Sequence, residues 1–192
     1  MVQQPARNDN ATSDQRLRDI GDLGGQVAVI SGSTSGIGLA IARAVAQRGG
    51  NVVLNGLGDA DQIERTRAGL EAETGARVLY HPADMTHGDQ VADMVAFAKA
   101  QLGRVDILVN NAGIQHVEAV EAFPTDKWEQ IIAINLSSAF YATRAAIPIM
   151  KAQGRGRIVN IASAHGLVAS PFKSAYVCLL YTSDAADDLL CV

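Results

Sequence analysis

The chain has 192 residues, of which 48% are hydrophobic and 19% are charged, and its formal net charge is −4. This size and composition are typical of one globular domain with a sizeable core, and no apolar run approaches the roughly 20 residues that span a bilayer. The acidic balance, without a basic stripe, argues against a nucleic-acid partner.

The cysteines and histidines exclude further classes of protein. Both cysteines lie within residues 178–192, so a disulfide framework is excluded and a reducing cytoplasm is the expected location. The four histidines lack the spacing of metal ligands, and we predict no metal site. Residues 1–24 are polar and lack the apolar core of a secretory signal, so we expect a polar N-terminal arm there.

Strand-like and helix-like segments alternate along the rest of the chain. Short apolar runs are typical of buried strands, and apolar residues at helical spacing that end near Gly are typical of helices. The predicted strands are 26–31, 51–55, 77–81, 105–110 and 157–162. The predicted helices are 36–48, 59–74, 88–102 and 125–153, the last one bent or interrupted. This order indicates an α/β fold, a Rossmann-like, doubly wound parallel sheet between two layers of helices.

A glycine-rich loop follows the first predicted strand and opens the first predicted helix. It reads SGSTSGIG from Ser31 onward. Its first Gly permits a tight turn, and the other two let a dinucleotide approach the backbone while the helix packs on the sheet. The helix N-terminus offers free N–H groups to a pyrophosphate. A plain strand-to-helix turn is the alternative, but the position favours a dinucleotide site. The predicted binding residues are Gly32, Ser33, Ser35, Gly36, Ile37 and Gly38.

The end of the second predicted strand bears on the choice of dinucleotide. NAD-binding proteins often place an acid there to accept hydrogen bonds from the ribose, whereas NADP requires a cation. This chain reads NGLGD from Asn55, without the acid in the usual place and without a nearby Arg or Lys. A 2′-phosphate would have no counter-charge, so we predict NAD as the cofactor, with NADP as the alternative.

The Gly-x-x-x-Gly-x-Gly spacing resembles that of the short-chain dehydrogenase/reductase family, with Ser31 where that family usually has Thr. The run from Asn110 to Gly113 is similar to the family's Asn-Asn-Ala-Gly motif, which braces the sheet and lines the cofactor cleft. Asp84 matches the acid that contacts the adenine, although a loop or helix-capping acid is the alternative. The resemblance thus adds these residues to the cofactor site: Asp84, Asn111, Ala112 and Gly113.

Three residues match catalytic positions of the family, namely Asn135, Ser163 and Tyr176. The resemblance implies that Tyr176 is the acid/base, that Ser163 binds the substrate oxygen, and that Asn135 binds a water. A free tyrosine has a pKa of about 10, and the family lowers it with a lysine four residues later on the same helix face. Leu180 stands there instead, so we expect little or no turnover from this chain.

Two stretches, residues 113–117 and 163–176, are more specific than the family at large. They resemble the bacterial D-3-hydroxybutyrate dehydrogenases within it, which implies that Gln115, His165 and Lys173 reach a substrate carboxylate. The positive charge of Lys173 suits a small hydroxy acid. The alternative for Lys173 is a solvated charge in a loop. The alternatives for the protein are a related enzyme for another hydroxy or oxo compound and a catalytically dead nucleotide-binding module. For a full-length protein the resemblance implies a homotetramer.

Residues 178–192 depart from the family. They read CLLYTSDAADDLLCV where the resemblance implies the rest of a helix, a further strand, a substrate lid and a last helix and strand. The start of this run also back-translates to the end of a common sequencing-library adapter. We therefore expect a dinucleotide-binding domain over residues 25–177 that is incomplete at its C-terminus, with an exposed apolar patch, followed by a non-native tail.

Overall fold

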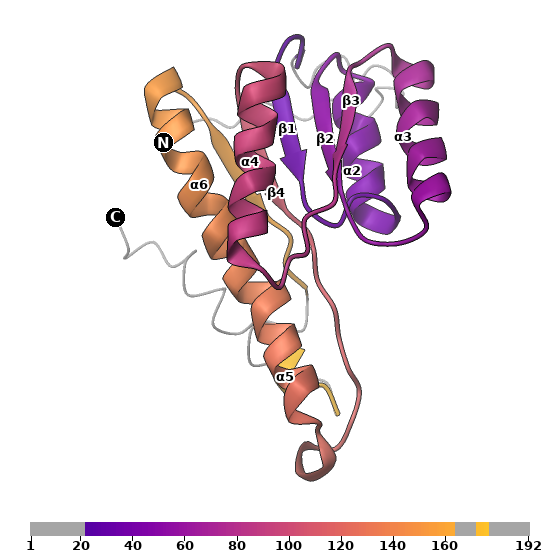
Figure 1. Cartoon of the computed structure of the whole chain (residues 1–192), viewed down its shortest axis with the longest axis vertical. Coiled ribbons are helices and arrows are strands. Elements are labelled where there is room, and N and C mark those ends of the chain that lie inside the picture. The colour runs from indigo at the N-terminus through magenta and orange to yellow at the C-terminus, as the bar shows by residue number, and fades with distance from the viewer. Residues whose placement is uncertain (1–21, 164–171, 177–192) are drawn as a thin grey trace, which may run out of the picture.

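The computed structural model describes residues 22–163 and 172–176 (Figure 1). Within them, strands and helices alternate as the sequence predicts. The predicted strand 51–55 matches the observed one, and the other four predicted strands exceed the observed ones by one or two residues at an end. In chain order the elements are β1 (Val27–Ile30), α2 (Gly36–Ala46), β2 (Asn51–Asn55), α3 (Ala60–Thr74), β3 (Val78–His81), α4 (Gly88–Leu102), β4 (Ile107–Asn110), η1 (Val120–Ala122), α5 (Thr125–Ile132), η2 (Ala133–Ser137), α6 (Ser138–Gln153) and β5 (Arg157–Asn160). Most of the predicted N-terminal arm lies outside the described residues. The whole predicted C-terminal tail, with Leu180, and also His165 lie outside them.

The five strands form one parallel sheet in the order β3-β2-β1-β4-β5. Val29 of β1 lies in register with Val53 of β2 on one side and with Leu108 of β4 on the other. The chain builds outward from β1 to β3 and then crosses back to place β4 on the other side of β1. The predicted doubly wound parallel sheet is confirmed, and sheets of this kind bind ligands at the carboxyl ends of the strands where the order reverses.

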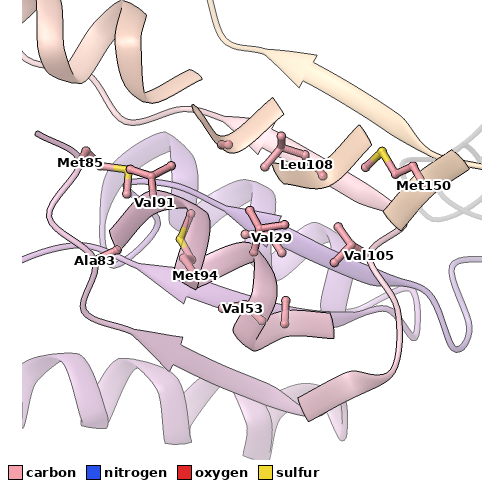
Figure 2. Close-up of a cluster of buried hydrophobic side chains, with 13 residues drawn as sticks. Val29, Val53, Ala83, Met85, Val91, Met94, Val105, Leu108 and Met150 are labelled. Atoms are coloured by element: carbon pink, nitrogen blue, oxygen red, sulfur yellow. The ribbon is translucent and has the colours of Figure 1, made fainter. Parts of the chain in front are cut away.

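Two layers of helices cover the sheet, and successive strand residues face opposite layers. On one face, Val29, Val53 and Leu108 pack against α4 and α6, and Figure 2 shows them beside Val91 and Met94 of α4. On the other face, which α2 and α3 cover in Figure 1, the packed strand residues are Ala28, Ile30, Val52, Leu54, Val78 and Val109. The buried strands read as continuous apolar runs because both of their faces are covered.

The long helical segment over residues 125–153 is interrupted, as predicted. Its middle part, Ala133–Ser137, is a π-helical turn between α5 and α6. Such turns insert an extra residue into the helical hydrogen-bond ladder and occur often at functional sites. The turn contains Asn135, and α5 extends beyond the carboxyl ends of the strands (Figure 1).

Strand β5 is an edge of the sheet in the described part of the chain. All 4 of its residues are exposed, among them Ile158 and Val159, and the exposed Ile161 follows. Exposed apolar side chains therefore lie along this edge.

Two kinds of feature are absent from the described ranges, 22–163 and 172–176. No helix there has both the length and the hydropathy that crossing a membrane requires. No group of three or more His, Cys, Asp or Glu side chains there is arranged to hold a metal ion.

Candidate active site

Ser31 ties the glycine-rich loop to the segment that follows β4. Its buried hydroxyl accepts hydrogen bonds from the N–H groups of Asn111 and Ala112, each at 3.0 Å, and donates to the carbonyl of Val109 at 3.4 Å. A hydroxyl has one donor and two acceptor sites, so all three are used. The Ser31 hydroxyl thereby fixes the loop across the switch point between β1 and β4.

The loop approaches its neighbours so closely that glycine is required. Gly32 has a φ of +61°, and a Cβ there would lie 2.9 Å from Cα of Ala112. A Cβ on Gly38 would overlap the carbonyl oxygen of Gly32. Asn111 closes the arrangement, since its Nδ2 donates to the carbonyls of Ser31 at 3.0 Å and Gly32 at 2.9 Å. The loop therefore presents bare backbone, as a bound pyrophosphate requires.

The N-terminus of α2 is open at the end of this loop. Ser35 precedes the helix in an extended conformation, and its side chain makes no capping hydrogen bond. Gly36 begins the helix, and the side chain of Ile37 is 66% exposed. The first-turn N–H groups thus have no side-chain cap from Ser35 and are available to an anion.

Ser33 is buried, in contrast to these residues. Its hydroxyl donates to the carbonyl of Ile30 at 2.6 Å and accepts from the N–H of Asn55 at 3.0 Å. Its own N–H donates to the carbonyl of Asn55 at 2.6 Å. Ser33 therefore braces the loop against the end of β2, and its polar groups are already used.

Asn55 joins three strand ends, a function that the sequence reasoning missed. Its side chain is fully buried; Oδ1 accepts from the N–H of Gly32 at 3.2 Å, and Nδ2 donates to the carbonyls of His81 at 3.1 Å and Ala83 at 2.9 Å. In the sequence, this position is notable only because the usual acid is missing from the strand end. An amide beside a glycine-rich loop, at the end of an apolar strand, was the available signal.

Asp84 lies after β3, at the edge of the sheet where we predict the adenine to bind. Its Oδ1 accepts from the N–H of Thr86 at 2.9 Å and from the Thr86 hydroxyl at 2.8 Å, and Oδ2 lies 3.6 Å from Nδ1 of His87. The Thr86 N–H, the Thr86 hydroxyl and then His87 hold the pKa of the Asp84 carboxyl below its ordinary value. The charged carboxylate shapes this loop and keeps further acceptor sites.

Asn135 fixes the segment that follows the Asn-Asn-Ala-Gly motif. From the π-helical turn, Oδ1 accepts from the N–H of Ile114 at 2.9 Å, and Nδ2 donates to the carbonyl of the same residue at 2.9 Å. Asn110, at the start of the motif, donates through Nδ2 to Oδ1 of Asn160 at 2.8 Å. One pair thus joins the ends of β4 and β5, and the other joins the loop after Gly113 to the π-helical turn.

The segment with Tyr176 packs on this same loop. The N–H of Glu118 donates to the carbonyl of Phe172 at 2.9 Å. The side chain of Ala175 is fully buried and packs with Ile131 of α5. Tyr176 and Lys173 are both half-buried. Residues 172–176 are therefore docked against the loop after β4 and against α5.

The remaining predicted substrate residues lie around this region. Gln115 is exposed and lies one residue beyond Ile114, which Asn135 holds. Ser163 is half-buried and follows β5 by three residues. His165 lies outside the described residues. The carboxyl ends of the strands thus carry, in order across the sheet, Asp84 and Asn55, the glycine-rich loop, and the segments with the catalytic candidates.

Such a surface can hold a dinucleotide with its adenosine over β2 and β3 and its reactive ring over β4 and β5. Residues 26–178 match the family model described as short chain dehydrogenase. The match begins just before β1 and ends two residues after Tyr176.

Two curated relatives are both named D-beta-hydroxybutyrate dehydrogenase. The protein of Rhizobium meliloti (strain 1021) is 59% identical over 152 residues, which are 79% of this chain and 59% of the relative. The protein of Cupriavidus necator is 56% identical over 155 residues, which are 81% of this chain and 59% of the relative. The chain therefore spans about three fifths of the length of these relatives.

A solved structure shares the fold. It is a crystal structure of a protein from Sinorhizobium meliloti 1021 described as a short-chain alcohol dehydrogenase, with a TM-score of 0.78 and 32% sequence identity. The similarity covers 86% of this chain and 69% of that one.

Proposed function

The chain belongs to the short-chain dehydrogenase family, and on that premise we propose that it is a large part of an oxidoreductase that transfers a hydride between NAD and (R)-3-hydroxybutyrate or acetoacetate. The observation that carries the proposal is the docking of residues 172–176, with Lys173 and Tyr176, onto the loop that carries Gln115. The names of the two curated relatives support this choice of substrate.

The residues present fit a dinucleotide. The bare backbone around Gly32 and Gly38 and the uncapped start of α2 suit a pyrophosphate. The cofactor would supply the hydride acceptor when the alcohol is oxidised. Gly36, Ile37 and Asn111 lie along the surface on which it would rest, and Ser33 and Asn55 stabilise that surface from below.

Tyr176 would move the proton in this reaction. When hydride leaves the carbinol carbon, the hydroxyl oxygen must lose its proton, and the Tyr176 oxygen is the group that we assign to accept it. Ser163 would donate a hydrogen bond to the same substrate oxygen. Asn135 already uses both polar groups of its side chain on Ile114, so a bound water would be held by its backbone carbonyl.

Lys173, Gln115 and His165 would bind the substrate carboxylate. A charged ammonium and two hydrogen-bond donors together orient a small anion and leave its hydroxyl free to face Tyr176. A second candidate is a related enzyme for another small hydroxy or oxo compound, since gluconate 5-dehydrogenase of Gluconobacter oxydans is 37% identical over 158 residues.

NAD is the cofactor that we propose rather than NADP. A titration of the chain with both dinucleotides tests this choice, and tighter binding of NADP would reverse it. A complete protein with this domain would assemble as a homotetramer, which sedimentation of a completed chain would check.

We further propose that residues 178–192 are not part of the family domain. The family match extends only one residue into them, and Leu180 stands at the position where the family resemblance implies a lysine. The 192-residue chain should therefore show little or no turnover. The DNA sequence of the gene tests the origin of this run, because codons unrelated to the adapter would contradict it.

A completed chain tests the function itself. Residues 1–177 can be joined to the C-terminal remainder of the Rhizobium meliloti relative and assayed with (R)-3-hydroxybutyrate, its (S) enantiomer and other small alcohols. Turnover of the (R) enantiomer supports the proposal, and turnover of another alcohol alone supports the related enzyme. Nucleotide binding without turnover of any alcohol would identify a catalytically dead nucleotide-binding module.

A further inference from the structure

A small apolar cluster joins the two segments that carry the proposed substrate residues. Its buried members are Ala175 and Ile131, and its partly buried members are Ile114, Phe123 and Ile132. Ile114 directly precedes Gln115, and Ala175 directly precedes Tyr176. The packing of this cluster therefore sets how the loop after β4 lies relative to residues 172–176.

Phe123 is the largest side chain of the cluster, and its ring contacts two further rings. Its centroid lies 5.3 Å from that of the His116 ring, at an interplanar angle of 87°, and 6.3 Å from that of the Trp128 ring, at 85°. Edge-to-face arrangements of this kind are among those that aromatic pairs prefer. His116 belongs to the same loop as Gln115, and Trp128 belongs to α5. Phe123 thus fixes that loop against the helix while it packs on the buried members of the cluster.

Residues 172–176, which lie beside α5 in Figure 1, depend on such contacts. Phe172 has a φ of +63°, a conformation that is uncommon in residues with a Cβ and that costs free energy. Its carbonyl accepts the N–H of Glu118 at 2.9 Å. This hydrogen bond and the packing of Ala175 both tie the segment to the loop and the helix that Phe123 joins.

The cluster is separate from the two large cores of the domain. Among the described residues, none of its members belongs to the core on either face of the sheet. The surface on which the dinucleotide would rest is braced by other contacts, namely the hydrogen bonds of Ser31 and Asn55. A change at Phe123 should therefore displace the proposed substrate residues and leave the dinucleotide surface intact.

We infer that Phe123 is a positioning residue, which sets where Lys173 and Tyr176 lie relative to Gln115 and acts on the reaction through them. This inference rests on the proposed function and adds a residue on which its geometry depends. A merely structural residue would weaken NAD binding and turnover together, whereas the loss of Phe123 should change the constants for the hydroxy acid and spare the affinity for NAD.

The first test is fluorescence of the 192-residue chain, whose only tryptophan is Trp128. Phe123→Ala should expose the indole further, so its emission should shift to longer wavelength and acrylamide should quench it more strongly. Phe123→Tyr, which keeps the ring, should behave as the parent does. Val120→Ala, an exposed change in the same loop, is the control. Unchanged emission and quenching in Phe123→Ala would overturn the contact on which the inference depends.

The second test is steady-state kinetics of the completed chain with (R)-3-hydroxybutyrate. Phe123→Ala should lower kcat and raise KM for this substrate, so that kcat/KM falls about tenfold or more, because a misplacement of about 1 Å can cost about 10²-fold. The Kd for NAD should stay unchanged, and Phe123→Tyr should keep the constants of the parent. In a Lys173→Ala background, Phe123→Ala should raise KM by a smaller factor than it does alone, since the contact that it positions is already lost.

Three results with an active parent would overturn the inference. They are unchanged constants in Phe123→Ala, a loss of NAD affinity as large as the loss in kcat/KM, and independent effects of Phe123→Ala and Lys173→Ala on KM. If the parent turns over no (R)-3-hydroxybutyrate, the proposed function itself fails, and the inference fails with it.

Discussion

Asn135 holds both backbone polar groups of Ile114, because Oδ1 accepts its N–H and Nδ2 donates to its carbonyl, each at 2.9 Å. The two residues are 21 positions apart, and the pairing joins the π-helical turn to the loop that leads to Gln115. The position of Gln115 in the proposed carboxylate site therefore depends on the π-helical turn between α5 and α6.

Replacing Asn135 by Ala should lower the free energy of unfolding by about 1–3 kcal/mol, because the Ile114 backbone groups lose their partners. Urea denaturation of the chain measures this, and Glu129→Ala, an exposed change on α5, is the matched control. An unfolding free energy equal to that of the parent would show that the pairing contributes nothing.

Ser31→Ala should destabilise the chain by a similar amount, about 1–3 kcal/mol, since the N–H groups of Asn111 and Ala112 would be left without their acceptor. It should also weaken NAD binding, because the glycine-rich loop loses its tie to β4. Ser31→Thr keeps the hydroxyl and should restore both properties. If Ala and Thr behave alike in calorimetry and in NAD titration, the hydroxyl is not the cause.

Asp106 should make stability depend on pH. Its side chain is 2% exposed. Oδ2 accepts from the N–H of Val27 at 2.9 Å and from Nε of Arg104 at 2.6 Å, and Oδ1 accepts from Nη2 of Arg104 at 2.8 Å and from Nε of Arg155 at 3.0 Å. Burial alone would raise the pKa of this carboxyl, but the Arg104 hydrogen bonds, the Val27 N–H and the nearby Arg155 together hold it below its ordinary value.

Because the folded-state pKa of Asp106 is depressed, its contribution is fully present above the unfolded-state pKa of about 3.9 and is lost as pH falls through the folded-state pKa. Asp106→Asn should lower the unfolding free energy at pH 7 by about 1–3 kcal/mol. The difference from the parent should shrink when urea denaturation is repeated at progressively lower pH, below about 4. A difference that stays constant through that range would contradict the assignment, and Glu121→Gln, exposed in η1, is the control.

The fold could be predicted from the sequence because its signals are local. The apolar runs at Val27–Ile30 and Asn51–Asn55 have both faces covered, and the helices end at glycines such as Gly75 and Gly103, which adopt positive φ. An interruption of the segment over residues 125–153 was also predictable, although its π-helical form was not.

The interactions that build the site could not be predicted in the same way. The contacts of Asn55 with Gly32 and Ala83, and of Asn135 with Ile114, join residues more than twenty positions apart. No periodic pattern reports which way a polar side chain turns at the end of a strand, so Ser33 could be predicted to lie in the loop but not to face inward.

Lys173→Ala should raise the KM for (R)-3-hydroxybutyrate in the completed chain about tenfold or more, because a charge-assisted hydrogen bond to the carboxylate is lost. The affinity for NAD should stay unchanged. Lys151→Ala, an exposed change in the last turn of α6, should leave both constants unchanged. Steady-state kinetics with both substrates varied separates the KM for (R)-3-hydroxybutyrate from that for NAD. An unchanged KM for (R)-3-hydroxybutyrate would show that Lys173 does not bind the carboxylate.

The most direct test of the proposed function is the initial rate of NADH formation by the completed chain with (R)-3-hydroxybutyrate, beside the same chain with Tyr176→Phe. We predict NAD-dependent turnover in the parent and a loss of about 10²- to 10⁴-fold in the variant, the usual contribution of a general acid–base group. An absence of turnover in the parent, or equal rates in the two proteins, would contradict it.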